Sequence, residues 1–292
     1  MQIDKDFFKA EERCGFTVTE EMKSLWAVEL DLFEKLKAVC EKYNITYHAS
    51  GGTLLGTIRH KGYIPWDDDI DITMLREDYN KLLEVADKEF SAPYFFQTAY
   101  NDVGYNNGHA QLRNSNTTAI LKSSNCKLKY NQGIFIDIFP LDNIPDDEAE
   151  FARQKEKINF LNKLLAMTVR YPCSPNKNIV KTILHYIASP FIPYRKVYKK
   201  LEQVCAQYNN TETKRVGLLS FMPNQENLYF PKYAFNKTVN VPFEMTEIAI
   251  PEGYDELLKI QYGNYMEMRK ENSYHGGLII DAEHPYTDYI NK

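Results

Sequence analysis

The chain has 292 residues, of which 43% are hydrophobic and 26% are charged, and its formal net charge is −5. This length and composition are typical of a globular enzyme with a sizeable core, and the acidic balance argues against nucleic-acid binding, which needs a basic surface. Five dispersed cysteines without a CxxC pair argue against a disulfide framework or a structural zinc. The charged N-terminus does not resemble a signal peptide, and no apolar run reaches the roughly 20 residues of a membrane span. We therefore expect a cytoplasmic protein.

The first half of the chain alternates predicted helices and strands. Apolar spacing predicts a helix from Thr19 to Tyr43, and Asn44 would end it. The pattern then predicts a strand at 45–49, a Gly51-Gly52 turn, a helix at 53–60, a strand at 69–74, a helix at 76–90, and strands at 94–99, 110–113 and 134–139.

The composition changes near Pro145, after which helical patterns dominate at 146–166 and 178–207. The tail mixes short predicted strands with a helix at 254–262. We therefore predict an α/β (α+β) fold with a mixed sheet and flanking helices. Residues 1–145 would form the catalytic core, and residues 146–292 a mostly helical accessory region packed on it, on the acceptor side.

Four carboxylates lie within five residues in the segment Asp67-Asp68-Asp69-Ile70-Asp71. At about 5 Å and an effective dielectric of about 20, each like-charged pair costs roughly 3 kcal/mol. Side chains alternate along a strand, so Asp69 and Asp71 would share one face. Such a pair can hold Mg²⁺ or Mn²⁺, which prefer oxygen ligands. In that site Asp67 and Asp68 would orient Arg59 or Lys61, or hold a second ion. The alternative is a solvated acidic turn.

A third acid, Asp137, stands alone in the apolar segment Gly133-Ile-Phe-Ile-Asp-Ile-Phe139. A charge is rarely buried without a partner. If this strand lies beside the strand of Asp69 and Asp71, Asp137 would bind the same metal or act as a general base. The alternative is a structural acid in a salt bridge.

The glycine pair Gly51-Gly52, followed by Thr53, stands between a predicted strand and a helix. Such a helix N-terminus offers N–H groups to a phosphate, although most glycine pairs are ordinary turns. Arg59 and Lys61, at the end of this helix, would contact phosphates or complement the helix C-terminus. Arg113 would reach a phosphate or form a surface pair.

Three segments resemble the LicD family: SGGTLLGTIRHKGYIPWDDDIDITMLREDY (50–79), GIFIDIFPLD (133–142) and IPEGYDELLKIQYGNYM (250–266). The resemblance implies a nucleotidyltransferase-type fold, with Gly51, Gly52, Asp69, Asp71 and Asp137 at the positions of the family pattern. It further implies metal-dependent transfer of phosphocholine, or a related phospho-alcohol, from CDP-choline or another CDP-alcohol to a sugar hydroxyl of a cell-surface glycan. That glycan would be a teichoic acid, a lipopolysaccharide or a capsule precursor. The zinc-binding cysteines of distant animal relatives are absent.

Three further features leave their alternatives open. Trp66, with Tyr63 and Tyr130 behind it, could receive a quaternary ammonium, or it could pack in the core. Residues 178–200 combine apolar and basic positions and would lie on the inner face of the plasma membrane, near a lipid-linked acceptor, or cover the core. His275 and His284 would bind metal or CMP, or belong to a polar loop.

Two other functions compete with phospho-alcohol transfer. A true nucleotidyltransferase would use the same acids and leave the nucleotide on the acceptor. A glycan-associated or lipid-associated scaffold would have lost its site, which the complete set of acids argues against.

Overall fold

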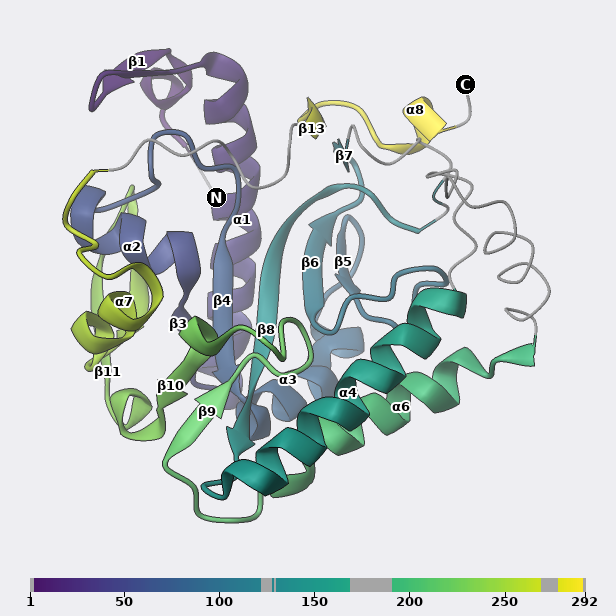
Figure 1. The fold of residues 1–292 in the computed structure, drawn as a ribbon. Coiled ribbons are helices and arrows are strands. Elements are labelled where there is room, and N and C mark those ends of the chain that lie inside the picture. Colours follow the sequence, from purple (N-terminus) through teal and green to yellow (C-terminus); the bar gives the residue numbers. More distant parts are fainter. Residues whose placement is uncertain (1–2, 122–127, 129, 169–190, 269–277, 291–292) are drawn as a thin grey trace, which may run out of the picture.

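The computed structural model describes residues 3–121, 128, 130–168, 191–268 and 278–290 (Figure 1). Within these residues the helices are α1 (Glu20–Tyr43), α2 (Gly51–His60), α3 (Arg76–Glu89), α4 (Glu148–Thr168), α6 (Tyr194–Cys205), α7 (Tyr254–Tyr262) and α8 (Thr287–Ile290). Short 3-10 helices are η1 (Lys5–Phe8), η3 (Ala206–Tyr208), η4 (Glu226–Leu228) and η5 (Lys232–Phe235). The strands are β1 (Glu11–Arg13), β2 (Phe16–Val18), β3 (His48–Ala49), β4 (Asp71–Leu75), β5 (Tyr94–Gln97), β6 (Ala110–Asn114), β7 (Thr118–Leu121), β8 (Ile134–Ile144), β9 (Arg215–Gly217), β10 (Tyr229–Pro231), β11 (Thr238–Phe243), β12 (Thr246–Pro251) and β13 (Leu278–Asp281).

A seven-stranded mixed sheet forms the centre of the molecule, with β8 as its longest strand. β8 runs parallel to β4 on one side, and on the other it pairs antiparallel with β6 and, near its end, with β9. All eleven residues of β8 are buried, as expected for a strand covered on both faces. The predicted fold class, a mixed sheet with flanking helices, is confirmed.

Helix α1 packs against this sheet and supplies much of the core. Thr19 caps its start, since the Thr19 Oγ1 accepts a hydrogen bond from the Met22 N–H at 3.2 Å. Asn44 ends the helix in the left-handed conformation, as predicted. Its buried face carries large apolar side chains such as Trp26, Leu30 and Phe33, and in Figure 1 the helix lies behind β4.

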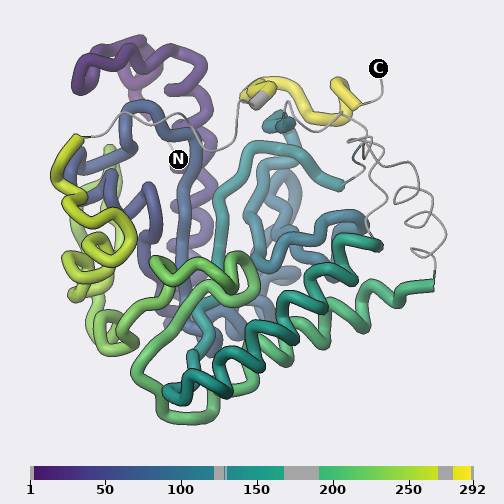
Figure 2. The backbone as a smooth tube through the Cα atoms, viewed as in Figure 1, coloured from purple at the N-terminus to yellow at the C-terminus, as the bar shows by residue number. Residues whose placement is uncertain are grey.

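The C-terminal half of the chain is not separate from this sheet. β9 and β10 extend it beyond β8, and β13 pairs with β7. Helices α4 and α6 lie side by side below the sheet in Figure 2, and their apolar faces form a second buried cluster. Strands from before and after the predicted boundary at residue 145 therefore belong to one sheet. The region after this boundary contains strands as well as helices.

Several predicted elements have different limits in the structure. Gly51 and Gly52 form the first turn of α2 and not a turn before it. The strand predicted from residue 45 is reduced to β3, and β4 begins at Asp71, so Asp69 precedes it. The segment predicted as a helix at 178–207 is described only from residue 191, where α6 forms its last part. Among the described helices, none combines the length and apolar content that crossing a membrane requires.

Candidate functional site

Three carboxylates meet where β4 and β8 run side by side. Asp71 at the start of β4 is the register partner of Asp137 on β8, and the Asp137 N–H donates to the Ile70 carbonyl at 2.9 Å. One oxygen atom from each of Asp69, Asp71 and Asp137 lies within 4.8 Å of the other two. The neighbouring Ile70 and Ile72 are fully buried. Within β4, alternation directs the Asp71 side chain to the cavity and the Ile72 side chain to the core.

A second group of carboxylates shares Asp69. Oxygen atoms of Asp67, Asp68 and Asp69 also approach one another within 4.8 Å. Burial raises the pKa of Asp69 well above its usual range, and the charges of Asp71, Asp67 and Asp137 raise it further. Asp69 thus stands at the most crowded point of the cluster, where a divalent cation would relieve the repulsion.

The start of helix α2 lies directly against two of these acids. Gly51 has a φ of +53°, and a Cβ there would come within 2.8 Å of the Asp71 Oδ2. A Cβ on Gly52 would collide with the Asp67 carboxylate. The glycines therefore allow the helix N-terminus, with its outward N–H groups, to approach the carboxylates. The Thr53 Oγ1 then accepts a hydrogen bond from the Asp71 N–H at 2.8 Å, which joins α2 to β4.

The orientation of Asp137 is set from the opposite side by strand β6. His109 Nε2 and Gln111 Nε2 lie 2.8 and 2.7 Å from the same oxygen, Asp137 Oδ1. His109 and Gln111 are both buried, and Gln111 is the register partner of Asp137. The His109 ring packs on Phe139, with ring centroids 4.2 Å apart. The buried polar side chains of His109 and Gln111 thus fix the orientation of the Asp137 carboxylate.

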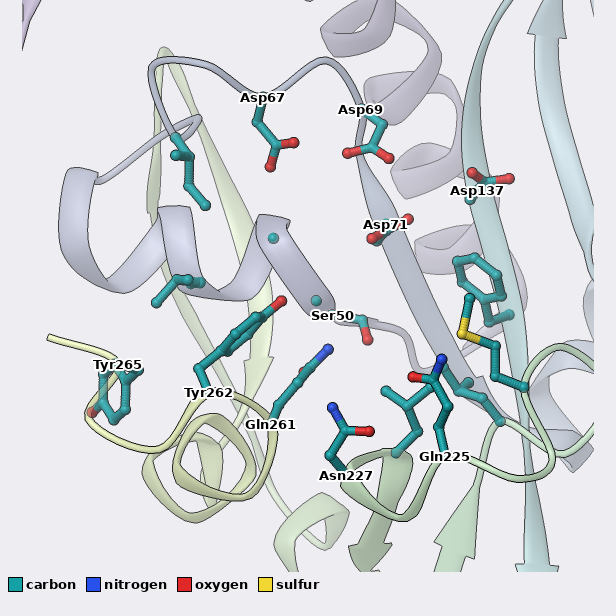
Figure 3. A pocket seen from close by; sticks show the side chains of 18 of the residues that line it. Ser50, Asp67, Asp69, Asp71, Asp137, Gln225, Asn227, Gln261, Tyr262 and Tyr265 are labelled. Atoms are coloured by element: carbon teal, nitrogen blue, oxygen red, sulfur yellow. The ribbon is translucent and has the colours of Figure 1, made fainter. Parts of the chain in front are cut away.

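These acids line a cavity of about 490 Å³. Its two walls come from distant parts of the chain, as the close view in Figure 3 shows. Ser50, Gly51 and Gly52 at the start of α2, with Asp67, Asp69, Asp71 and Asp137, form one side. Residues between 218 and 228 and between 261 and 267 form the other. A cavity of this size suits a single small-molecule ligand.

Of the other residues predicted to bind the substrate, the cavity includes Arg59 and Trp66. The Arg59 Nη1 donates to the carbonyl oxygens of Tyr265 (3.1 Å) and Glu267 (3.4 Å). The Arg59 Nε is buried and has no hydrogen-bond partner among the described residues. Trp66 is half-buried beside Phe16.

The structure places Arg113 away from the cavity wall. Its guanidinium is buried and donates to the Gln97 Oε1 (2.5 Å), the Gly133 carbonyl (2.6 Å) and the Gln111 Oε1 (2.5 Å). Phe135 lies under it, 4.5 Å away. Arg113 therefore holds β6 against its neighbours, and the predicted phosphate contact has no support from this position.

Other predicted residues also lie outside the cavity. Lys61 is exposed and ends α2 in the left-handed conformation. Tyr63 is buried in a stack on Trp26, with centroids 4.4 Å apart, and Tyr130 packs against Tyr105. His284 is exposed and contacts Asp281. His275 lies outside the described residues, as does most of the 178–200 segment.

The sequence reasoning missed His109, Gln111, Ser50 and the far wall of the cavity. One signal could have identified two of them. In the segment His109-Ala-Gln-Leu-Arg113, polar residues alternate with small or apolar ones, which in a buried strand places the polar side chains on one face. No such pattern marks the far wall.

Comparison with known proteins shows that this chain belongs to the LicD family. Residues 44–175 match the family model described as LicD/FKTN/FKRP, nucleotidyltransferase domain. The chain is 31% identical over 244 residues to the lipopolysaccharide cholinephosphotransferase LicD of Haemophilus influenzae, which covers 83% of this chain and 90% of that protein. An uncharacterized protein of Rickettsia prowazekii is 40% identical over 74 residues, which are 24% of this chain and 26% of that protein.

Proposed function

Because this chain belongs to the LicD family, we propose that it transfers phosphocholine, or a related phospho-alcohol, from a CDP-activated donor to a sugar hydroxyl of a cell-surface glycan. Similarity to the Haemophilus enzyme over most of both chains supports phosphocholine transfer to a glycan at the level of the family. The observation that carries the proposal for this chain is the meeting of Asp69, Asp71 and Asp137 beside a helix N-terminus in one cavity.

The charge of the cavity argues for a divalent cation. Among the described lining residues, four aspartates and Glu267 face a single cationic side chain, that of Arg59. A diphosphate would be repelled from such a surface. The oxygen ligands and the crowding around Asp69 fit Mg²⁺ or Mn²⁺, held by Asp69, Asp71 and Asp137. When bound, the ion would neutralise charge on the diphosphate and on the departing CMP.

The residues of the chain would orient the reactants and move one proton. The N–H groups at the start of α2 and the Arg59 guanidinium bind phosphate oxygens. The acceptor hydroxyl attacks the phosphorus that carries the alcohol, a new P–O bond forms, and the bond to the CMP oxygen breaks with its electron pair. The hydroxyl proton passes to a carboxylate of the cluster. Asp137, whose orientation is fixed by His109 and Gln111, is the best-oriented base if it does not complete the metal shell.

The aromatic lining suits a choline donor. Trp66, Phe139, Phe221, Tyr262 and Tyr265 contribute rings to the cavity wall. A quaternary ammonium over such a ring gains roughly 0.5 to 2 kcal/mol, and we assign this contact to Trp66.

The acceptor would be a glycan, in a lipid-linked form where the precursor is built on a lipid, with the enzyme on the inner face of the plasma membrane.

Product analysis tests the reaction. The protein is incubated with Mg²⁺ or Mn²⁺, a panel of CDP-alcohols and a glycan acceptor, and free CMP and modified acceptor are measured. We expect CMP release that EDTA abolishes and that Asp71→Asn removes. Asp78→Asn is the matched control, because Asp78 on α3 pairs with Lys81 and does not line the cavity. A CMP-tagged acceptor would instead identify a true nucleotidyltransferase, and the absence of turnover with every donor would refute the proposal.

A further inference from the structure

The cavity wall opposite the carboxylates is rich in neutral amide side chains. We call this set the carboxamide wall: Gln225, Asn227, Gln261 and Asn264. Gln225 and Asn227 come from the segment around η4, while Gln261 and Asn264 come from the end of α7 and the residues after it. In Figure 3 the side chains of Gln225, Asn227 and Gln261 extend from these two segments toward the space below Ser50 and Asp71. Tyr262 stands beside Gln261.

Gln225, Asn227 and Asn264 of this wall are exposed and Gln261 is half-buried, in contrast to the buried amides of the core. Gln97, Gln111 and Asn143 are buried and use their side-chain amides to hold strands and loops together. Within the part of the chain that the structure describes, no hydrogen bond is recorded from the side chains of the carboxamide wall to another residue. Their donors and acceptors are therefore available to a ligand, and each amide offers both types of group.

The chemistry of this wall fits a neutral, polar ligand group. None of its four members carries a charge. The start of α2 and the carboxylates that fit a metal ion lie on the opposite side, so phosphate is better placed there. A nucleobase edge presents donors and acceptors that pair with amides, and a ribose presents hydroxyls. Tyr262 adds an aromatic face on which a base can stack.

We propose that the carboxamide wall binds the nucleoside of the donor. This inference rests on the proposed function, in which the diphosphate lies at Asp69, Asp71 and Asp137. The nucleoside is covalently joined to that diphosphate, so it must lie in the same cavity of about 490 Å³. The acceptor needs only to bring one hydroxyl to the reacting phosphorus. The wall facing the acids is therefore the nucleoside subsite, and its amides select the base.

Binding measurements with separate parts of the donor test this subsite. The probes are CMP, UMP and phosphocholine, titrated calorimetrically in the presence of Mg²⁺. The variants are Gln225→Met, Asn227→Leu and Gln261→Met, which keep the side-chain size and remove the amide. Asn224→Leu is the matched control, because Asn224 is adjacent in sequence but exchanges hydrogen bonds with Asn159 outside the cavity. Melting curves establish that each variant is folded.

We expect each cavity variant to weaken CMP binding about fivefold, the effect of one lost hydrogen bond, and to reduce the preference for CMP over UMP. Phosphocholine affinity should stay unchanged, as should every affinity of the control. In the transfer assay, KM should rise for the donor and not for the acceptor.

Three results would overturn the assignment. Unchanged CMP affinity in all three folded variants would remove the subsite, and a rise confined to the KM of the acceptor would assign the wall to the acceptor sugar. Failure of the proposed function can be distinguished from failure of the subsite. A wild-type protein that binds CMP through these amides but transfers no phospho-alcohol would support the subsite and refute the proposed reaction. A wild-type protein that binds no cytidine nucleotide would refute the subsite directly.

Discussion

Replacing Asp69 with asparagine should abolish transfer and, without metal, make the protein more stable. Asp69 belongs to both carboxylate groups, and its oxygen atoms lie within 4.8 Å of those of Asp71 and Asp137. One such pair costs about 3 kcal/mol at an effective dielectric of about 20. Part of this repulsion is avoided by protonation, because the pKa of Asp69 is raised. We therefore expect a net gain of about 1–3 kcal/mol in the free energy of unfolding for Asp69→Asn in EDTA.

The pH dependence of this gain has a defined sign. A carboxyl whose pKa is higher in the folded than in the unfolded state binds more protons in the folded state, so stability falls as pH rises from its ordinary value through the raised one. The gain of Asp69→Asn should therefore be largest at neutral to alkaline pH and should disappear in acid, where the wild-type carboxyl is protonated in both states. Addition of Mg²⁺ should stabilise the wild-type protein and leave the variant almost unchanged.

Urea unfolding at several pH values, with EDTA or with Mg²⁺, measures these effects. Asp78→Asn on α3, outside the cavity, serves as the matched control and should show neither the gain nor the loss of metal response. If Asp69→Asn were less stable than the wild-type protein in EDTA at pH 8, repulsion among the carboxylates would not destabilise the metal-free protein. Metal-dependent transfer retained in the variant would remove Asp69 from the site.

Three further predictions concern other parts of the structure. Trp66→Ala should raise KM for CDP-choline more than for CDP-ethanolamine, because only the quaternary ammonium needs the ring; equal changes in steady-state assays would dismiss the contact. Gly51→Ala should destabilise the protein by about 1–2 kcal/mol, since the φ of Gly51 is +53°. It should also reduce kcat by displacing the Asp71 carboxylate. Thermal melts and initial rates measure the two effects, and wild-type values of both would show that the fold accommodates a side chain. Asp142→Ala should lower the free energy of unfolding, measured in urea, by about 3–5 kcal/mol, because Asp142 forms a buried bidentate pair with Arg76 at 2.8 and 2.6 Å. A decrease below about 1 kcal/mol would show that the pair contributes little.

The sequence was most informative where local pattern and burial agree. An apolar run interrupted by one acid predicted β8 and singled out Asp137, and the structure places that residue beside Asp71. Helix α1 followed from its apolar spacing and from its end at Asn44. The glycine pair was also singled out. A Cβ at these two positions would collide with the carboxylates of Asp71 and Asp67, and only the folded chain brings these carboxylates next to the glycines.

Other features depend on tertiary structure that the pattern does not encode. A lone arginine in a strand can face a ligand or its own neighbours, and Arg113 faces Gln97, Gln111 and Gly133. The cavity wall at Gln225 and Gln261 consists of side chains that look like ordinary surface residues in the sequence. Their role depends on where η4 and α7 pack, and this packing depends on contacts between residues far apart in the chain.

The parallel pairing of β4 and β8 has a consequence for how relatives of this protein can diverge. Asp71 and Asp137 are register partners, while Ile72 and Ile138, one position further along each strand, are fully buried. An insertion or deletion of one residue inside either strand would exchange the two faces, placing an acid in the core and an isoleucine in the cavity. Changes of length are therefore expected in the connection between residues 76 and 133, and the two strand segments should stay at constant length even where the rest of the sequence is no longer alignable.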